Sequence, residues 1–196
     1  MLRLIIMDCI EAILGRRSCR AFTNQIVEDE KLQKILTCAT YAPSPVNKQP
    51  WEFIVVRNRA YNHKLQEEAE KVKSYIAERS KWKWVSKYKV DFISQAPVLI
   101  IVVGDPSNNG AEQFLNTPVN GYKQACAAAI ENICIAAHCL GLGTLWFSLF
   151  EAKSAREIFS IASDKDPVGI ICLGYPAKEL VAPPRKAVCE KVQYID

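Results

Sequence analysis

Histidine is scarce in this chain of 196 residues, which contains only His63 and His138. The two histidines lie far apart, and none of the eight cysteines forms a CxxC pair, so ordinary zinc or iron–sulfur ligand spacing is missing. We therefore expect no metal site. The cysteines are scattered and no secretory signal precedes them, which favours reduced thiols and a cytoplasmic protein over a disulfide framework.

Long apolar runs are also missing, because no stretch approaches the roughly 20 residues that cross a bilayer. The net charge of +4 is mildly basic, which suits an anionic ligand and is too weak to require nucleic acid. We expect neither a membrane nor a nucleic acid as partner. With no repeat or linker, residues 1–196 are interpreted as a single domain, in which 1–6 form an N-terminal extension.

The spacing of apolar residues predicts helices and strands along most of the chain. Helices are expected at 8–15, 28–40, 120–140 and 153–161, and strands at 51–56, 96–104, 144–150, 168–173 and, as a final edge strand, 186–195. The first two helices are each expected to bury one face, and the apolar run 96–104 is typical of a central strand. The pattern indicates an α+β fold with a mixed central β-sheet surrounded by helices.

A short basic segment follows the first predicted helix. Arg16, Arg17 and Arg20 surround Ser18, and guanidinium groups with a hydroxyl suit the oxygens of a phosphate. The alternative is a basic turn in water, and this segment alone leaves both interpretations open.

A proline-rich loop precedes the first predicted strand. Pro43, Ser44, Pro45 and Asn47 combine a stiff backbone with hydroxyl and amide groups, which could hydrogen-bond the polar edge of a flat heterocycle. The alternative is a rigid connection into the strand.

Four separated blocks of this sequence resemble the nitroreductase family. They are Glu11–Phe22, Ala42–Trp51, Ala129–Thr144 and Leu173–Lys186, and the resemblance extends over about 8–194. It implies an α+β homodimer with two FMN sites at the subunit interface and a C-terminal extension that reaches the partner subunit.

The resemblance also assigns roles to individual residues. Around the FMN phosphate it places Arg16, Arg17, Ser18, Arg20 and Arg185; from the partner subunit it brings Pro43, Ser44, Pro45 and Asn47; near the ring it puts Gly143 and Thr144. The chain departs from the family at Ala125, where many members carry an acidic residue, and in lacking the Gly that often follows Trp146.

The stretch 63–94 matches nothing specific in the family, and its aromatic residues Trp82, Trp84 and Tyr88 are candidates for the substrate pocket. Lysines alternate with these aromatics, so single-stranded nucleic acid is an alternative ligand, although a helix with inward-packed aromatics and solvated lysines is favoured.

The predicted helix 120–140 also carries two residue types that can take part in chemistry, histidine and cysteine. His138 is interpreted as a structural residue rather than a proton donor. Cys134 and Cys139 are expected to be small core residues without a role.

The resemblance implies an enzyme in which flavin N5 carries the chemistry without a catalytic side chain. NADH or NADPH would supply a hydride, and a nitroaromatic, quinone or similar flat acceptor would take the electrons in a ping-pong cycle. Two alternatives stay open: a specialised flavoenzyme of the same fold, such as a reductive dehalogenase or a flavin-modifying oxygenase, and a non-catalytic protein that binds FMN or nucleic acid.

Overall fold

The computed structural model describes residues 8–116 and 119–195. Its helices are α1 (Cys9–Gly15), α2 (Asp29–Thr40), α3 (Arg59–Arg79), α4 (Phe92–Gln95), α5 (Gly121–Cys139) and α6 (Ala152–Phe159). Its strands are β1 (Trp51–Val56), β2 (Val98–Gly104), β3 (Gly143–Phe147) and β4 (Asp166–Gly174). The predicted helices and the first four predicted strands are confirmed, with shifts of a few residues at their ends. The α+β class is confirmed as well.

The four strands form one sheet in the order β1-β2-β4-β3. The prediction of a mixed sheet is wrong for these strands, because every pairing between them is antiparallel. A helix between consecutive strands allows either strand direction, so the sequence pattern could not decide the matter. Parallel pairing in the described residues is limited to an isolated bridge between Ser18 and Thr144.

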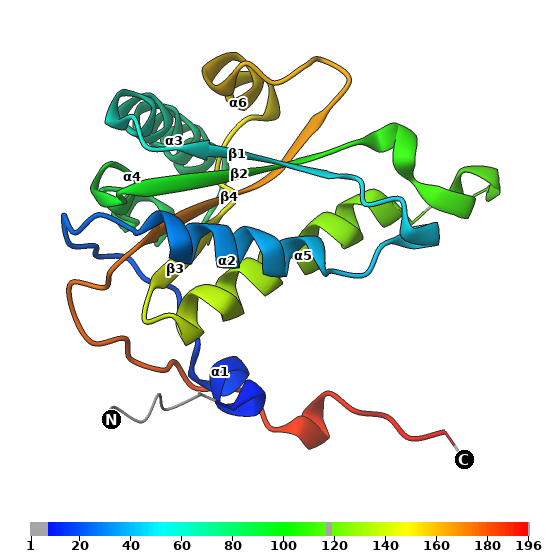
Figure 1. Ribbon diagram of the computed structural model, residues 1–196. Coiled ribbons are helices and arrows are strands. Elements are labelled where there is room, and N and C mark those ends of the chain that lie inside the picture. Colours follow the sequence, from blue (N-terminus) through cyan, green and yellow to red (C-terminus); the bar gives the residue numbers. More distant parts are fainter. Residues whose placement is uncertain (1–7, 117–118, 196) are drawn as a thin grey trace.

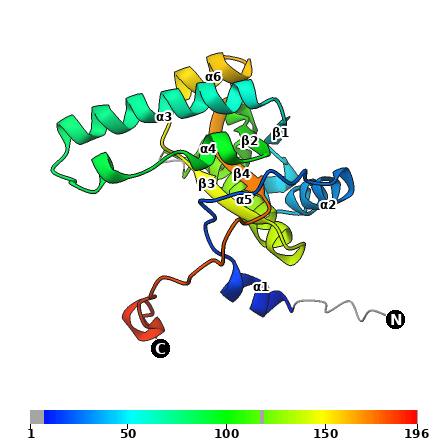
Figure 2. The same ribbon diagram turned by 90° about the vertical axis from the view of Figure 1, so that its left-hand side faces the viewer.

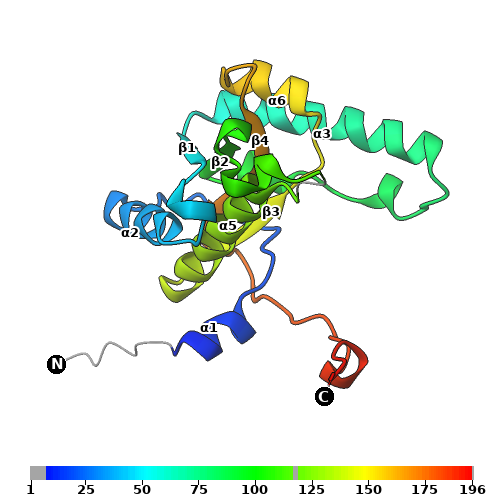
Figure 3. The ribbon, with the colours of Figure 1, turned by 90° about the vertical axis from the view of Figure 1, so that its right-hand side faces the viewer.

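Helices cover both faces of the sheet, which gives the molecule three layers (Figures 1 and 3). The strand β2 is central and fully buried. Its residues Val98, Ile100 and Val102 belong to the core under α2 and α5, whereas the alternate residues belong to the core under α3, α4 and α6. Full burial of one such aliphatic side chain contributes about 1.5–3 kcal/mol.

The core helix α5 ends in a Schellman motif at Gly141. This glycine has φ of +76°, a left-handed conformation that glycine adopts without steric cost. The Leu142 amide donates to the Ala137 carbonyl at 2.9 Å, and the Gly141 amide donates to the His138 carbonyl at 3.0 Å. The predicted stop at Gly141 is therefore confirmed, and β3 begins two residues later.

Both ends of the described chain lie apart from the three layers, where α1 and the C-terminal segment run below the body in Figure 1. In α1 Ala12 is buried, but Ile10 is 60% and Leu14 is 68% exposed, so the predicted buried face is wrong for the single chain. The predicted strand 186–195 is also wrong: the segment holds a short 3-10 turn at Val188–Glu190, because no strand of the described chain lies beside it.

The predicted N-terminal extension, residues 1–6, lies outside the described residues. Among those that are described, no helix combines the length and apolar character that a bilayer crossing requires.

Candidate functional site

A basic cavity of about 240 Å³ lies between the end of α1 and the C-terminal segment. It is lined by Arg16, Arg17, Ser18, Arg20, Val181, Pro183 and Arg185. The five residues assigned to the phosphate from the sequence are thus brought together, although Arg185 comes from the far end of the chain. Four guanidinium groups around one small cavity form a site for a compact anion with several oxygens.

The basic segment is held in place by β3. The Cys19 amide donates to the Thr144 carbonyl at 2.8 Å, next to the bridge between Ser18 and Thr144. Gly143 packs directly against this segment, since a Cβ added there would lie 2.7 Å from Cβ of Cys19. Gly143 and Thr144 therefore position the cavity residues, and glycine is required at 143 by the close approach of Cys19.

Arg16 shows that the cavity suits an anion. Its Nε lies 3.3 Å from a carboxylate oxygen of Glu131 on α5, an ion pair whose geometry is not that of a hydrogen bond. This buried Nε has no hydrogen-bond partner among the described residues. A buried donor without a partner costs free energy, so an anion with spare acceptor oxygens fits the cavity.

The proline-rich loop lines a second cavity of about 240 Å³ with the beginning of α5. Its lining residues are Pro43, Ser44, Pro45, Gly121, Gln124, Ala125 and Ala128. The loop backbone is strained, because Val46, Asn47 and Gln49 have φ between 47° and 53°, a conformation that costs about 1–2 kcal/mol per residue. Strain of this kind is concentrated at ligand sites.

Three of the four loop residues assigned from the sequence line this cavity, and Asn47 does not. The Asn47 side chain accepts a hydrogen bond from Gln49 Nε2 at 3.3 Å, while Ser44 Oγ accepts from the Gln49 amide at 3.0 Å. Ala125, the position where the family often has an acidic residue, lies in the cavity wall.

The two cavities lie at different ends of α5. Gly121 starts the helix beside the proline-rich loop, whereas His138 in the last turn lies against Gly15, just before the basic segment. At 1.5 Å per residue, about 26 Å of helix separates Gly121 from His138. The two sets of residues assigned to one ligand are therefore not joined within the single chain.

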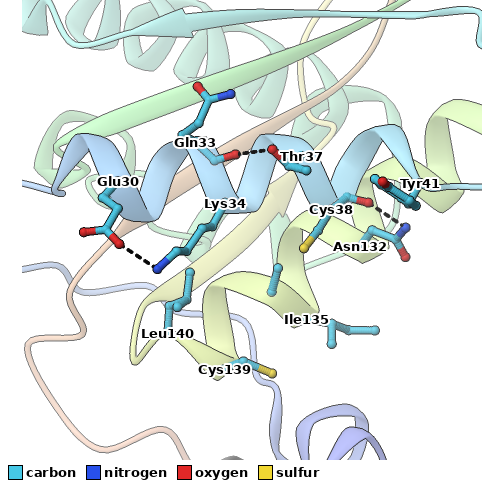
Figure 4. A pocket seen from close by; sticks show the side chains of 11 residues that line it. Glu30, Gln33, Lys34, Thr37, Cys38, Tyr41, Asn132, Ile135, Cys139 and Leu140 are labelled. Carbon is cyan, nitrogen blue, oxygen red and sulfur yellow. Dashed lines mark hydrogen bonds and ion pairs between the residues drawn. The ribbon is translucent and has the colours of Figure 1, made fainter.

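A larger cavity of about 1040 Å³ lies between α2 and α5 (Figure 4). Ile135 and Leu140 face it from α5, and Asn132 crosses to α2 by donating to the Cys38 carbonyl at 3.0 Å. Cys139 also lines this groove and is exposed. The prediction that Cys139 is a core residue is wrong, because the last turn of α5 presents it to the groove rather than to the sheet.

The aromatic segment after α3 reaches the basic segment through one residue. Tyr88 lies 5.9 Å from the Trp84 ring, and the Arg20 guanidinium lies 6.0 Å over the Tyr88 ring. Trp82 and Trp84 are 61% and 56% exposed, so the favoured interpretation of inward-packed aromatics is wrong for both. Figure 2 shows α3 and this segment projecting beyond the sheet.

Burial decides the chemistry of the thiols and of one imidazole near the site. It raises the pKa of Cys134 to about 11, so this thiol is inert near neutral pH, as expected for a core residue. Burial, followed by the positive charges of Arg16 and Arg17, lowers the pKa of His138 below its ordinary value.

Sequence reasoning missed four residues that complete the basic cavity or its surroundings. Val181 and Pro183 form part of the wall, Glu131 pairs with Arg16, and His138 packs on Gly15. Glu131 and His138 are seven residues apart, so they share one face of α5, and this spacing was the available signal.

Known proteins are similar to most of this chain. The profile of the nitroreductase family matches residues 13–175. A "Putative NADH dehydrogenase/NAD(P)H nitroreductase" from Methanothermobacter thermautotrophicus is 37% identical over 176 residues, which cover 88% of this chain and 79% of the relative. An iodotyrosine deiodinase from Hydra vulgaris is 28% identical over 180 residues, which cover 86% of this chain and 65% of the relative.

Solved structures share the fold. A BluB-like flavoprotein from Clostridium difficile 630 superposes with a TM-score of 0.80 at 27% identity, covering 97% of this chain and 100% of that one. An FMN-dependent nitroreductase from Clostridium difficile R20291 superposes with a TM-score of 0.72 at 26% identity, covering 95% of this chain and 99% of that one. The family match and the relatives named as NAD(P)H nitroreductases identify the chain as an oxidoreductase. The chain belongs to the nitroreductase family.

Proposed function

We propose that this protein is an FMN-dependent oxidoreductase that passes reducing equivalents from NADH or NADPH to nitroaromatics, quinones or similar flat acceptors. The observation that carries the proposal is the basic cavity, in which the arginines around Ser18 meet Arg185. Relatives named as NAD(P)H nitroreductases support the electron donor, and the solved FMN-dependent nitroreductase supports the cofactor.

The chain's own residues bind and orient the cofactor. Arg16, Arg17, Arg20 and Arg185 would hold the phosphate group by charge-assisted hydrogen bonds, each worth about 1.5–3 kcal/mol, with Ser18 as a further donor. Held by these residues, FMN would supply the redox chemistry that carries electrons from the nicotinamide to the acceptor in a ping-pong cycle. The protein needs no catalytic side chain for this reaction.

The complete site would require a homodimer. A second copy would bring the loop Pro43–Asn47 to the basic cavity, which lies at the other end of α5 in the same chain. Ser44 is half-buried in the cavity beside the start of α5, and Gly143 and Thr144 lie next to the basic segment. These positions are consistent with a flavin held between subunits. The cofactor would then contact both chains.

Exposed apolar surface supports the second copy as the partner. The groove between α2 and α5 is lined mainly by carbon atoms, and α1 presents Ile10, Ile13 and Leu14 to solvent. The C-terminal segment adds Val188 at 75% and Ile195 at 90% exposure. Unpaired apolar surface of this extent is typical of an interface, and a symmetric dimer would cover the groove with a segment of the other copy.

The substrate pocket is proposed to include Trp82, Trp84 and Tyr88, whose rings form a continuous series with Phe92. Flat acceptors stack well on such rings. We expect Trp84→Ala to raise KM for a nitroaromatic while FMN affinity stays unchanged. The matched control is Tyr75→Ala, which removes an exposed ring from α3 outside this series.

The visible spectrum of the purified protein tests the proposed function. We expect a yellow protein whose flavin absorbance is bleached by anaerobic NADH or NADPH and restored by a nitroaromatic. A colourless protein that does not bind added FMN would contradict the proposal. If the flavin is bleached but no nitroaromatic or quinone restores it, the specialised alternatives become the better account, and dehalogenation of a halotyrosine is then the assay.

A further inference from the structure

His138 lies beside the basic cavity rather than in the interior of the core. The position of His138 on α5 places its imidazole over the backbone of Gly15. A Cβ added at Gly15 would lie 2.7 Å from Nε2 of His138. Gly15 is the last residue of α1 and is followed directly by Arg16 and Arg17. A side chain at position 15 would displace the imidazole, so the glycine and the histidine form one contact between α1 and α5.

The positive charges that act on His138 come from the residues that directly follow α1. They belong to Arg16 and Arg17 and disfavour a second cation nearby, in addition to the effect of burial. Arg16 is itself paired, at 3.3 Å, with Glu131, which lies two turns before His138 on α5. Two of the arginines that line the cavity therefore also disfavour the protonated imidazole.

We propose that His138 is a positioning residue of the phosphate site, which takes up a proton from solvent when a phosphate group occupies the cavity lined by Arg16 and Arg17. The inference rests on the proposed binding of FMN. A phosphate monoester carries a charge of about −1.5 to −2 near pH 7, so its arrival offsets much of the positive charge of the arginines around the cavity. A protonated imidazole would then be opposed less by the charges of Arg16 and Arg17 and would be attracted by the phosphate.

Linkage makes this effect reciprocal. If phosphate binding favours protonation of His138, protonated His138 strengthens phosphate binding by the same factor. A shift of about one pH unit in the titration of His138 corresponds to a factor of about ten in affinity between the fully protonated and the neutral imidazole. Riboflavin has the same ring system without the phosphate, so it should leave His138 unaffected.

Proton NMR can follow this directly, because the chain has two histidines. His63 is the internal control: it lies on α3 among Gln66, Glu67, Glu70 and Lys71, away from the basic segment. The full-length protein would be titrated without flavin, with FMN and with riboflavin. We expect FMN to raise the titration midpoint of His138 by about one unit, with His63 unchanged and riboflavin without effect. Equal midpoints for His138 with FMN and with riboflavin would overturn the proposal.

A variant provides the reciprocal measurement. The FMN Kd of His138→Gln divided by that of the wild type should grow several-fold, with about tenfold as the limit, as the pH falls from 8 to 5.5, because only the wild type gains the proton. The titration of the phosphate itself affects both proteins and cancels in the ratio. A ratio that does not change with pH would contradict the proposal.

The same titrations distinguish failure of this inference from failure of the proposed function. A protein that binds no FMN contradicts the proposed function, and inorganic phosphate is then the probe for His138. A midpoint that does not respond to saturating phosphate overturns the inference on its own. A protein that binds FMN without moving the His138 midpoint leaves the proposed function intact.

Discussion

The guanidinium Nε of Arg16 lies 3.3 Å from a carboxylate oxygen of Glu131, which ties the residue after α1 to the middle of the core helix α5. The Glu131 side chain is 46% exposed, so solvent screens the pair and its contribution is modest. Its consequence is geometric: the carboxylate helps to hold the Arg16 side chain at the wall of the basic cavity.

Glu131→Gln tests this positioning role. The loss of the charge should leave Arg16 less well oriented and weaken FMN binding about two- to fivefold, equivalent to about 0.5–1 kcal/mol. Isothermal titration calorimetry measures the effect. The control is Glu78→Gln, which removes an exposed carboxylate paired with Arg79 at the end of α3. Equal or tighter binding by Glu131→Gln would show that the carboxylate competes with the phosphate instead.

Gly143→Ala tests the contact that fixes the basic segment. The added methyl group would lie 2.7 Å from Cβ and 2.9 Å from Sγ of Cys19, so the segment or the strand must shift. We expect the free energy of unfolding to fall by about 1–3 kcal/mol and FMN affinity to fall about tenfold or more. Chemical denaturation and flavin titration give the two values.

Gly141→Asn is the matched control for that substitution. Gly141 has φ of +76° and no atom within 4 Å of an added Cβ, and asparagine tolerates this conformation. Its FMN affinity should equal that of the wild type. Equal loss of FMN affinity in both variants would mean that the effect comes from general destabilisation.

Ile10→Glu tests the proposed dimer. Ile10 is 60% exposed in the single chain, so a charge there costs little unless a second copy covers it. Sedimentation should show the wild type at twice 22.0 kDa and the variant at 22.0 kDa, with loss of bound FMN. Ile26→Glu, at a site 80% exposed and outside α1, is expected to remain dimeric. A monomeric wild type that retains FMN would refute the proposed interface site.

Asp105→Asn tests an ion pair that joins the ends of β2 and β4. Hydrogen bonds from Lys165 and then Ser107 lower the pKa of Asp105 to about 2. Because the folded pKa is below the unfolded value, this stabilisation is present above about pH 4 and is lost as the pH falls towards 2. The free energy of unfolding of the variant should be about 0.5–1 kcal/mol lower at pH 7, allowing for screening. Measured by urea unfolding, it should also fall less than that of the wild type as the pH is lowered. Exposed Asp164→Asn should behave as the wild type.

Local patterns in the sequence predicted those parts of the fold that depend on neighbouring residues. The apolar run 96–104 became the central strand β2, and Gly141 ended α5 where expected. Strand direction, the exposed face of α1 and the irregular segment at 186–195 depend on which elements meet in space. The spacing of apolar residues along the chain does not determine which elements pack together.

The same division holds for the candidate site. Arg16–Arg20 and Arg185 could be grouped from the sequence through the family resemblance, and they line one cavity. Glu131 and His138 could not be assigned to it, because their role arises from the packing of α5 against the end of α1. Trp84 was predicted to belong to the substrate pocket, and this assignment stays a prediction.

The ratio of the Kd values for riboflavin and FMN tests the central claim most directly, because the two ligands differ by the phosphate group alone. If the cavity lined by Arg16, Arg17, Arg20 and Arg185 holds that phosphate, riboflavin should bind about a hundredfold or more weakly, which corresponds to about 3 kcal/mol or more from a few charge-assisted hydrogen bonds. Kd values for the two ligands within about threefold of each other would contradict the account.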